Sequence, residues 1–508
     1  MNANSQIKKG ALLSYAALIF NITAGFIYTP WMVSQIGKSD YGLYVLVGSF
    51  LTYFVMDFGL GQTIAKFVTD YKAQNQLDKI GQLLGLTARF YVFVNVFIFL
   101  ALIIAYFFID TIFIELTSAE IAKFKIVYLI VGGFSLISFP FLPLDGVLIA
   151  YERFVILKLC DFISKLSIIV LMVIALLLGY KLYALVAINA AVGIGIIIIK
   201  VIFLKKILPI KINFKYKSKT LLKELFKFSF WISIIGVAQR LLINIAPMIL
   251  GIVSGTEAIA IFSIGVIIEA YSWSFAHALN GLFLAKVSQL NTEQDNRKEI
   301  TNLMIRVGRI QLIIMGLLLI GLIVFGQEFI ILWMGEGFSK SYYVVLLLIL
   351  PGFITLTQEI AYTYLFVINE LKYRAILFVA AALTSVVLSF ILAPSLGALG
   401  CAIGIFVATI LCHVIGMNFI YWKKVHLEIP RFFKECYGSL LTPMLTTVVF
   451  GSIMNHFYPS PSYIGFVLKG SSTATVYILL IWFIGLKLDE KLFFKGSFKS
   501  VLSVFKIK

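Results

Sequence analysis

The sequence predicts an all-α polytopic membrane protein. Of its 508 residues, 61% are hydrophobic and only 13% are charged, and short polar breaks separate long apolar stretches. The hydrocarbon core of a bilayer is about 30 Å thick and takes roughly 20 apolar residues of helix to cross. Fourteen stretches of this chain are that long or nearly so. Membrane strands need only about 9–11 residues, so these lengths indicate helices.

The fourteen predicted transmembrane helices are residues 10–36, 42–66, 85–108, 126–150, 156–179, 183–204, 228–253, 258–284, 309–333, 342–368, 374–393, 398–421, 437–457 and 464–486. The first span follows Lys8 and Lys9, is too long for a signal-peptide core and precedes no small-residue cleavage motif. We therefore expect it to be retained. Because fourteen is an even number, both termini are expected on the same side of the membrane.

The distribution of basic residues predicts the orientation. If the amino terminus is cytoplasmic, the inner segments and helix ends hold 35 of the 42 Lys and Arg residues. The outer loops hold six, namely Lys38, Lys123, Lys125, Lys181, Lys340 and Lys469. This asymmetry predicts that both termini are cytoplasmic. The formal charge of +18 then describes a face that meets anionic membrane lipids, and no nucleic-acid partner is expected.

The sequence lacks the motifs that mark several kinds of active site. No loop exceeds about 25 residues, and the four cysteines and four histidines are scattered without metal-ligand spacing. There is no Gly-Lys phosphate loop, no nucleophile elbow and no acidic loop pair that could bind a metal–nucleotide sugar. A primary pump or a glycosyltransferase would need one of these features. We therefore expect a protein that is not an enzyme and has no cofactor, while coupling to an H⁺ or Na⁺ gradient is left open.

The first twelve predicted helices form a weak internal repeat. The matched features are Pro30 and Ser39-Asp40 with Pro247 and Thr256-Glu257 at an offset of 217, and Glu152 with Glu370, Gly179 with Gly397, and Lys205-Lys206 with Lys423-Lys424 at an offset of 218. Six helices per repeat predict two parallel six-helix lobes around a central cavity. The predicted divisions are residues 1–215, residues 216–425, and residues 426–508. The last division holds two extra helices and a basic tail, which is either an interfacial helix or a solvated, frayed end.

Arg240 is the main candidate for a functional residue. It lies twelve residues inside its predicted helix, about 18 Å from the inner boundary and so near the midplane. A charge there costs about 3 kcal/mol, so it should have a partner. Glu269 lies at a similar depth in the next helix. The two residues form either an ion pair that only fixes packing, or a cavity site where Arg240 meets an anionic substrate and Glu269 tunes it. Asn244 and Pro247 share the stripe of Arg240, at i+4 and i+7.

Further ionisable residues are weaker candidates. Glu269, Trp273 and His277 share a helical face, so that Glu269 and His277 could relay protons, although a single His near a helix end is more often only hydrogen-bonded. Three acidic residues occupy the inner third of helices near Gly or Pro, where they are better explained as partners for backbone groups freed at kinks: Asp57, Asp145 and Glu359. Three basic residues mark inner helix ends as positive-inside anchors that could also receive a lipid phosphate: Lys66, Arg89 and Arg153.

Four stretches resemble a known family. They are "TPWMVSQIGKSDYGLYVLVGSFLTYFVMDFGLG" (29–61), "AYERF" (150–154), "EFIILWMGEGF" (328–338) and "YWKKVHLEIPRFFKE" (421–435). They are similar to the polysaccharide-export branch of the multidrug/oligosaccharidyl-lipid/polysaccharide flippase superfamily, typified by bacterial O-antigen and capsule repeat-unit flippases. The resemblance implies two six-helix lobes in a V shape with two extra helices. It also implies a cationic cavity, for which Arg240 is suitably placed, and a basic residue after the Gly-Leu-Gly turn, which is Lys66 here.

The function implied by this resemblance is movement of an undecaprenyl-diphosphate-linked oligosaccharide across the bacterial plasma membrane by alternating access. The implied partners are this lipid-linked glycan and membrane lipids, with other polysaccharide-assembly membrane proteins as a further candidate class. Two alternatives remain. A multidrug cation antiporter of the same superfamily would favour acidic cavity residues such as Asp57 and Glu269. A glycan polymerase or ligase would need a larger outer loop than the one at residues 110–125.

Overall fold

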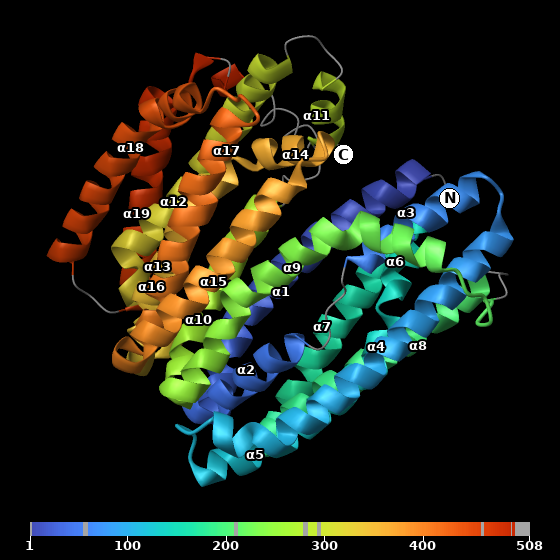
Figure 1. Cartoon of the computed structure of the whole chain (residues 1–508). Coiled ribbons are helices and arrows are strands. Elements are labelled where there is room, and N and C mark those ends of the chain that lie inside the picture. The colour runs from blue at the N-terminus through green and yellow to red at the C-terminus, as the bar shows by residue number, and fades with distance from the viewer. Residues whose placement is uncertain are drawn as a thin grey trace, which may run out of the picture. The chain divides into compact units, whose positions relative to one another are not determined.

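The structure is a computed structural model that describes residues 3–53, 59–207, 212–277, 283–291, 296–458, 462–488 and 490–492. All regular secondary structure in these ranges is helical (Figure 1). The α-helices are α1 (Ala3–Ile36), α2 (Lys38–Thr52), α3 (Leu60–Ala73), α4 (Leu77–Ile112), α5 (Ser118–Ser138), α6 (Pro143–Ala150), α7 (Phe154–Leu177), α8 (Leu182–Ile207), α9 (Lys219–Val253), α10 (Thr256–His277), α11 (Leu284–Leu290), α12 (Asn296–Met334), α13 (Ser341–Thr357), α14 (Glu359–Val367), α15 (Leu371–Leu396), α16 (Ala398–Ala408), α17 (Met417–Lys423), α18 (Ile429–Phe457) and α19 (Tyr463–Leu480). Short 3-10 segments lie at Phe139–Phe141 and Glu336–Phe338, and π-helical turns at Thr409–Gly416 and Ile481–Gly485.

The helices confirm an all-α membrane protein with many spans. Within the described ranges, eleven helices are long and apolar enough to cross a bilayer. The number becomes twelve if α13 and α14, which are bent by 56° relative to each other, form one span. The other two predicted spans coincide with α1 and with α2 plus α3, so the count of fourteen is compatible with the structure.

One predicted span differs from the structure in its continuity. Residues 42–66 were expected to form a single helix, but α2 ends at Thr52 and α3 begins at Leu60. Gly59 precedes α3 with φ of 66°, a left-handed conformation that glycine adopts without steric cost. The predicted span is therefore divided between two helices.

Two compact units make up the chain. The first comprises Met1–Ser263 and Arg374–Ala408, and the second comprises Ile264–Tyr373 and Thr409–Lys508. These units are groups of residues that pack closely with one another, whereas the predicted divisions at residues 215 and 425 follow from the internal repeat in the sequence. The predicted divisions therefore stay a prediction.

Close helix packing in the first unit depends on glycine. Helix α3 packs against α6, and a Cβ atom added at Gly146 of α6 would overlap the carbonyl oxygen of Gly61 in α3. A backbone oxygen cannot give way as a flexible side chain can, so a larger residue at Gly146 would separate the two helices. This contact explains why glycine follows Asp145 in "PLDG".

The first turns of α2, α5 and α10 meet in a polar cluster. The hydroxyl groups of Ser39 and Thr256 both donate to the Glu120 carboxylate, at 2.5 and 2.6 Å, and their two oxygens lie 3.1 Å apart. Glu120 also accepts from the backbone N–H of Thr117, completing a capping box. Ser39 and Thr256 are equivalent positions of the predicted repeat, so the structure brings one matched pair into contact through Glu120.

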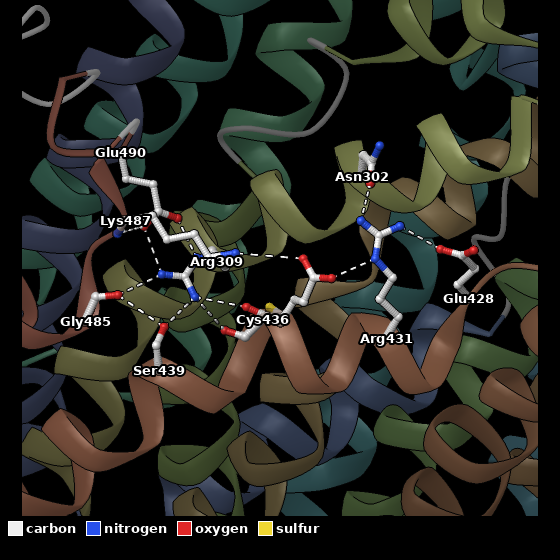
Figure 2. Close-up of polar contacts among 10 residues, drawn as sticks. Asn302, Arg309, Glu428, Arg431, Cys436, Ser439, Gly485, Lys487 and Glu490 are labelled. Carbon is white, nitrogen blue, oxygen red and sulfur yellow. Dashed lines mark hydrogen bonds and ion pairs between the residues drawn. The ribbon is translucent and has the colours of Figure 1, made fainter.

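In the second unit, α12, α18 and α19 pack together around Arg309, which Figure 2 shows in close-up. The side chain of Arg309 is 1% exposed. Its Nε and Nη2 donate to the two carboxylate oxygens of Glu490, at 2.5 and 2.9 Å. Its remaining donors bond the carbonyl oxygens of Glu435 and Gly485 and the hydroxyl group of Ser439. Arginine supplies five N–H donors in a fixed plane, which suits such a fully hydrogen-bonded environment.

The electrostatics of this cluster favour the ionised carboxylate. Glu490 follows the last candidate membrane span, which ends at Gly485. Burial alone would raise the pKa of Glu490, but hydrogen bonds from Arg309 and from the backbone N–H of Lys487, together with the charge of Arg309, lower the pKa below its ordinary value. The chain that follows α19 is thereby fixed to the beginning of the apolar part of α12.

A second buried ion pair joins the same three helices. Lys469 of α19 is 4% exposed and donates to Glu328 of α12 at 2.6 Å and to Asn455 of α18 at 3.0 Å. The sequence analysis assigned Lys469 to an outer loop, and this assignment is wrong because the residue lies inside α19. Its ammonium group can be buried because two protein oxygens replace its water ligands.

Candidate functional site

Arg240 lies in α9 of the first unit and contacts the end of α2. The guanidinium Nη1 donates to the carbonyl oxygen of Thr52 at 2.8 Å, and the hydroxyl group of Tyr53 donates to the backbone carbonyl of Arg240 at 3.2 Å. The side chain is half-buried. Thr52 is the last residue of α2, so the carbonyl group that Arg240 meets is one of those left without a partner inside the helix.

This contact supplies a structural reason for an arginine in an apolar helix, and one that the sequence did not reveal. The carbonyl end of a helix carries partial negative charge, which a cation stabilises by about 0.3–1 kcal/mol or more where water is scarce. The single hydrogen bond to Thr52 uses one of five N–H donors. Among the described residues the guanidinium makes no other hydrogen bond or ion pair, and the four donors that have no partner among them could bond a ligand or water.

A cavity of about 340 Å³ adjoins this contact in the same unit. Its lining comes from α2, α5, α8 and α9, and consists of Tyr44, Val45, Gly48, Ser49, Thr52, Val127, Val131, Phe134, Val186, Asn189, Ala190 and Asn244. Thr52 belongs to the lining and also accepts the hydrogen bond from Arg240. Asn244 lies one turn after Arg240 on α9, as the predicted polar stripe requires. The guanidinium therefore lies beside a cavity with a partly polar wall.

Two lining residues are held in place by each other. The Nδ2 atom of Asn189 donates to the hydroxyl oxygen of Tyr44 at 2.9 Å and to the carbonyl oxygen of Leu185 at 3.1 Å. Asn189 and Tyr44 were missed by the sequence analysis. The available signal was a single asparagine within the apolar run of α8, "LYALVAINAAVG", because an amide in such a run needs a polar partner.

Glu269 belongs to the second unit, where its carboxyl group is 8% exposed and accepts a hydrogen bond from the Trp273 side chain. Arg240 and Glu269 thus fall in different units, and their pairing stays a prediction. The side chain of His277 and the whole of Asp57 lie outside the described residues. The structure therefore brings together Arg240 and Asn244 but does not test the proposed relay between Glu269 and His277.

The remaining predicted residues lie apart from the cavity lining. Lys66 of α3, Arg89 of α4 and Arg153, which precedes α7, all have exposed side chains. Asp145 forms an ion pair with Lys200 of α8 at 2.7 Å, a partner that the sequence did not indicate. Glu359 begins α14, where the helix pair α13 and α14 bends. No group of three or more His, Cys, Asp or Glu residues in the described part of the chain could hold a metal ion.

Comparisons with known proteins agree on the kind of molecule. Residues 7–269 match the family model described as polysaccharide biosynthesis protein. The solved structure described as lipid II flippase MurJ in an inward closed conformation has a TM-score of 0.69 and 14% identity, covering 93% of this chain and 97% of that chain. An inward-facing multidrug resistance MATE family transporter of the MOP superfamily has a TM-score of 0.65 and 13% identity, with 84% and 99% covered.

A eukaryotic MATE transporter, AtDTX14, has a TM-score of 0.54 and 15% identity, covering 85% of this chain and 98% of that chain. A search of the curated proteins found no match. At these identities the solved structures show the fold alone, which is that of the MurJ and MATE transporters. The family model covers more than half of the sequence, and the chain belongs to the polysaccharide biosynthesis protein family.

Proposed function

We propose that the protein is a flippase that moves an undecaprenyl-diphosphate-linked oligosaccharide from the inner to the outer leaflet of a bacterial plasma membrane. The observation that carries this proposal is a cationic side chain beside a partly polar cavity, Arg240 next to Thr52 and Asn244, in a polysaccharide biosynthesis family member. The fold shared with a protein described as a lipid II flippase supports it.

The chemistry of Arg240 suits a diphosphate. A guanidinium binds phosphate oxygens through paired N–H donors, and such charge-assisted hydrogen bonds are roughly twice as strong as neutral ones. A diphosphate that leaves water also pays a desolvation cost, which a positive charge in a region of low dielectric offsets in part. In the proposed cycle the head group enters from the cytoplasmic leaflet, the prenyl chain stays in lipid, and rearrangement of the lobes opens the outer side.

The orientation and the lipid contacts belong to the same proposal. The distribution of Lys and Arg supports a cytoplasmic position for both termini. Lys66, Arg89 and Arg153 are exposed, which allows each of them to meet a lipid phosphate at the inner face. Other membrane proteins of polysaccharide assembly are proposed as partners that supply or use the translocated glycan.

A multidrug cation antiporter is the second candidate function. The MATE-like fold and the buried carboxyl group of Glu269 favour it. Against it, none of the described residues that line the cavity beside Arg240 is acidic, and a cation would be repelled by the guanidinium. The two functions therefore predict opposite charges for the transported molecule.

Reconstituted vesicles distinguish these functions. The protein is incorporated into lipid vesicles that contain a fluorescent prenyl-diphosphate oligosaccharide, and a membrane-impermeant quencher reports the fraction in each leaflet. We expect the protected fraction to become accessible in protein-containing vesicles and to stay protected in protein-free ones. A parallel assay loads vesicles with a cationic dye, which we expect to be retained. Dye efflux without movement of the lipid-linked glycan would favour the antiporter instead.

A further inference from the structure

The cavity of the first unit has a wall that is largely apolar and carries a few polar side chains, none of them charged among the described residues. Its polar side chains are the hydroxyl groups of Tyr44, Ser49 and Thr52 and the amides of Asn189 and Asn244. Among the residues that the structure describes, no Asp, Glu, Lys, Arg or His lines it. Such a wall can accept and donate hydrogen bonds but cannot neutralise a charge, so neither a diphosphate nor an organic cation is a suitable occupant.

Some of these polar groups have hydrogen-bonding capacity left over. Thr52 donates its hydroxyl proton to the carbonyl of Gly48, and Asn189 uses its amide N–H groups on Tyr44 and Leu185. The Tyr44 hydroxyl accepts that bond and keeps its own proton to donate. In the part of the chain that the structure describes, the Ser49 hydroxyl and the Asn244 amide make no hydrogen bond. Polar groups in an apolar helix bundle are costly without partners, so a hydroxyl-rich ligand would stabilise them.

An aromatic ring completes the wall. Phe134 of α5 lines the cavity, and its ring fits against Gly193 of α8, where an added Cβ would lie 2.5 Å from the ring. Glycine at this position therefore leaves room for the ring between α5 and α8. A sugar ring presents hydroxyl groups at its edge and C–H groups on its faces, and the amides, the hydroxyls and the aromatic rings of Tyr44 and Phe134 complement both.

The volume limits what can enter. A cavity of about 340 Å³ lies at the small end of the usual range for ligand pockets, about 300–1,000 Å³. Gly48 adds to the open space, because a Cβ at this position would meet no atom within 4 Å. The space is suited to about one or two sugar rings rather than to a whole oligosaccharide.

We propose that this cavity is a subsite for an uncharged sugar ring of the transported glycan, adjacent to the diphosphate-binding Arg240. The inference rests on the proposed transport of a lipid-linked glycan and adds the place where the glycan is recognised. The neutral cavity would bind the sugar, and the neighbouring guanidinium would bind the diphosphate. The protein could then select each part of the substrate through separate contacts.

A binding experiment tests the subsite. The full chain in lipid nanodiscs is titrated calorimetrically with octanol, with octyl phosphate and with octyl β-glycosides of glucose, galactose, N-acetylglucosamine and rhamnose, all below their micellar concentrations. We expect at least one glycoside to bind roughly tenfold more tightly than octanol, as one or two additional hydrogen bonds allow. Gly48→Phe should abolish this gain by filling the cavity, and Asn244→Leu should reduce it severalfold.

The control for the filled cavity is Gly133→Phe. Gly133 lies on α5 outside the cavity lining, is exposed, and also has open space around its Cβ position. This variant should bind the glycosides as the wild type does. If no glycoside binds better than octanol, or if the gain survives Gly48→Phe, the cavity is not a sugar subsite.

The two proposals fail in different ways. Octyl phosphate binding should be weakened by Arg240→Gln and unaffected by Gly48→Phe, because the phosphate is assigned to the guanidinium. Absence of the glycoside gain in the wild-type protein, with phosphate binding and glycan transport intact, would overturn the subsite alone. Absence of glycan transport by the wild-type protein, with glycoside binding present, would overturn the proposed function and leave a sugar-binding cavity.

Discussion

Replacement of Arg240 by alanine or glutamine is expected to lower the rate of glycan translocation by roughly a hundredfold, since loss of a buried charge contact costs about 2–5 kcal/mol. Arg240→Lys should keep part of the rate, because an ammonium group retains the charge but not the paired donors. The measurement is the initial rate of translocation in vesicles, divided by the amount of folded protein. The hydrogen bond from Arg240 to the end of α2 makes this normalisation necessary.

Tyr53→Phe is the matched control for Arg240. Its hydroxyl group bonds the backbone of Arg240 and not the guanidinium, so the variant removes a contact at the same place and leaves the charge intact. We expect its translocation rate to stay close to that of the wild type. If the Arg240 variants lose activity only in proportion to folded protein, the arginine stabilises α2 and does not bind substrate. If neutral replacement of both Arg240 and Glu269 then restores protein and activity together, the two residues form a packing ion pair.

Replacement of Arg309 by methionine is expected to cause the largest loss of stability. The side chain is almost completely buried and pairs with Glu490 through two hydrogen bonds, as Figure 2 shows. Removal of one partner from a buried ion pair costs about 3–5 kcal/mol because the other charge stays buried. We expect little folded protein after purification in mild detergent, measured by the area of the monodisperse peak in size-exclusion chromatography and by the melting temperature.

Arg431→Met is the matched control for Arg309. Arg431 also bonds two carboxylates, those of Glu428 and Glu435, but its side chain is 34% exposed. Exposed ion pairs contribute about 0–1 kcal/mol, so this variant should melt close to the wild type. The double variant Arg309→Met with Glu490→Leu should recover most of the lost stability, because it removes the unpaired charge as well. Equal melting temperatures for Arg309→Met and Arg431→Met would contradict this account of the cluster.

The helices were predictable because each depends mainly on a continuous apolar stretch, which the sequence displays directly. Breaks inside such stretches were harder to predict. Residues 42–66 are apolar enough for one span, but the chain adopts a left-handed conformation at Gly59 and forms two helices. The pair α13 and α14 was likewise expected as one span, and the bend between them occurs where Gln358 bonds Asn418. The hydropathy of a short stretch of sequence does not indicate that Gln358 will bond a residue 60 positions away.

The candidate site was also predictable in part, because polar residues are conspicuous in an apolar stretch of sequence. Arg240 and Asn244 stood out because polar residues at i and i+4 interrupt an apolar helix. Their surroundings depend on contacts between residues far apart in sequence, such as Arg240 with Thr52 across 188 positions. Lys469 was assigned wrongly, and Arg309 was not singled out, for a related reason: basic residues near helix ends normally meet water. Here Glu490 and Glu328 replace that water, and only the folded structure shows it.

The most direct test of the proposed function compares two fluorescent prenyl oligosaccharides in the same protein-containing vesicles. The two molecules share the prenyl chain and the glycan, and differ only in whether a diphosphate or an uncharged linker joins them. The account predicts that the wild-type protein translocates the diphosphate-linked glycan at least about tenfold faster, because the guanidinium of Arg240 binds the diphosphate. Equal rates for the two molecules, or translocation of neither, would contradict it.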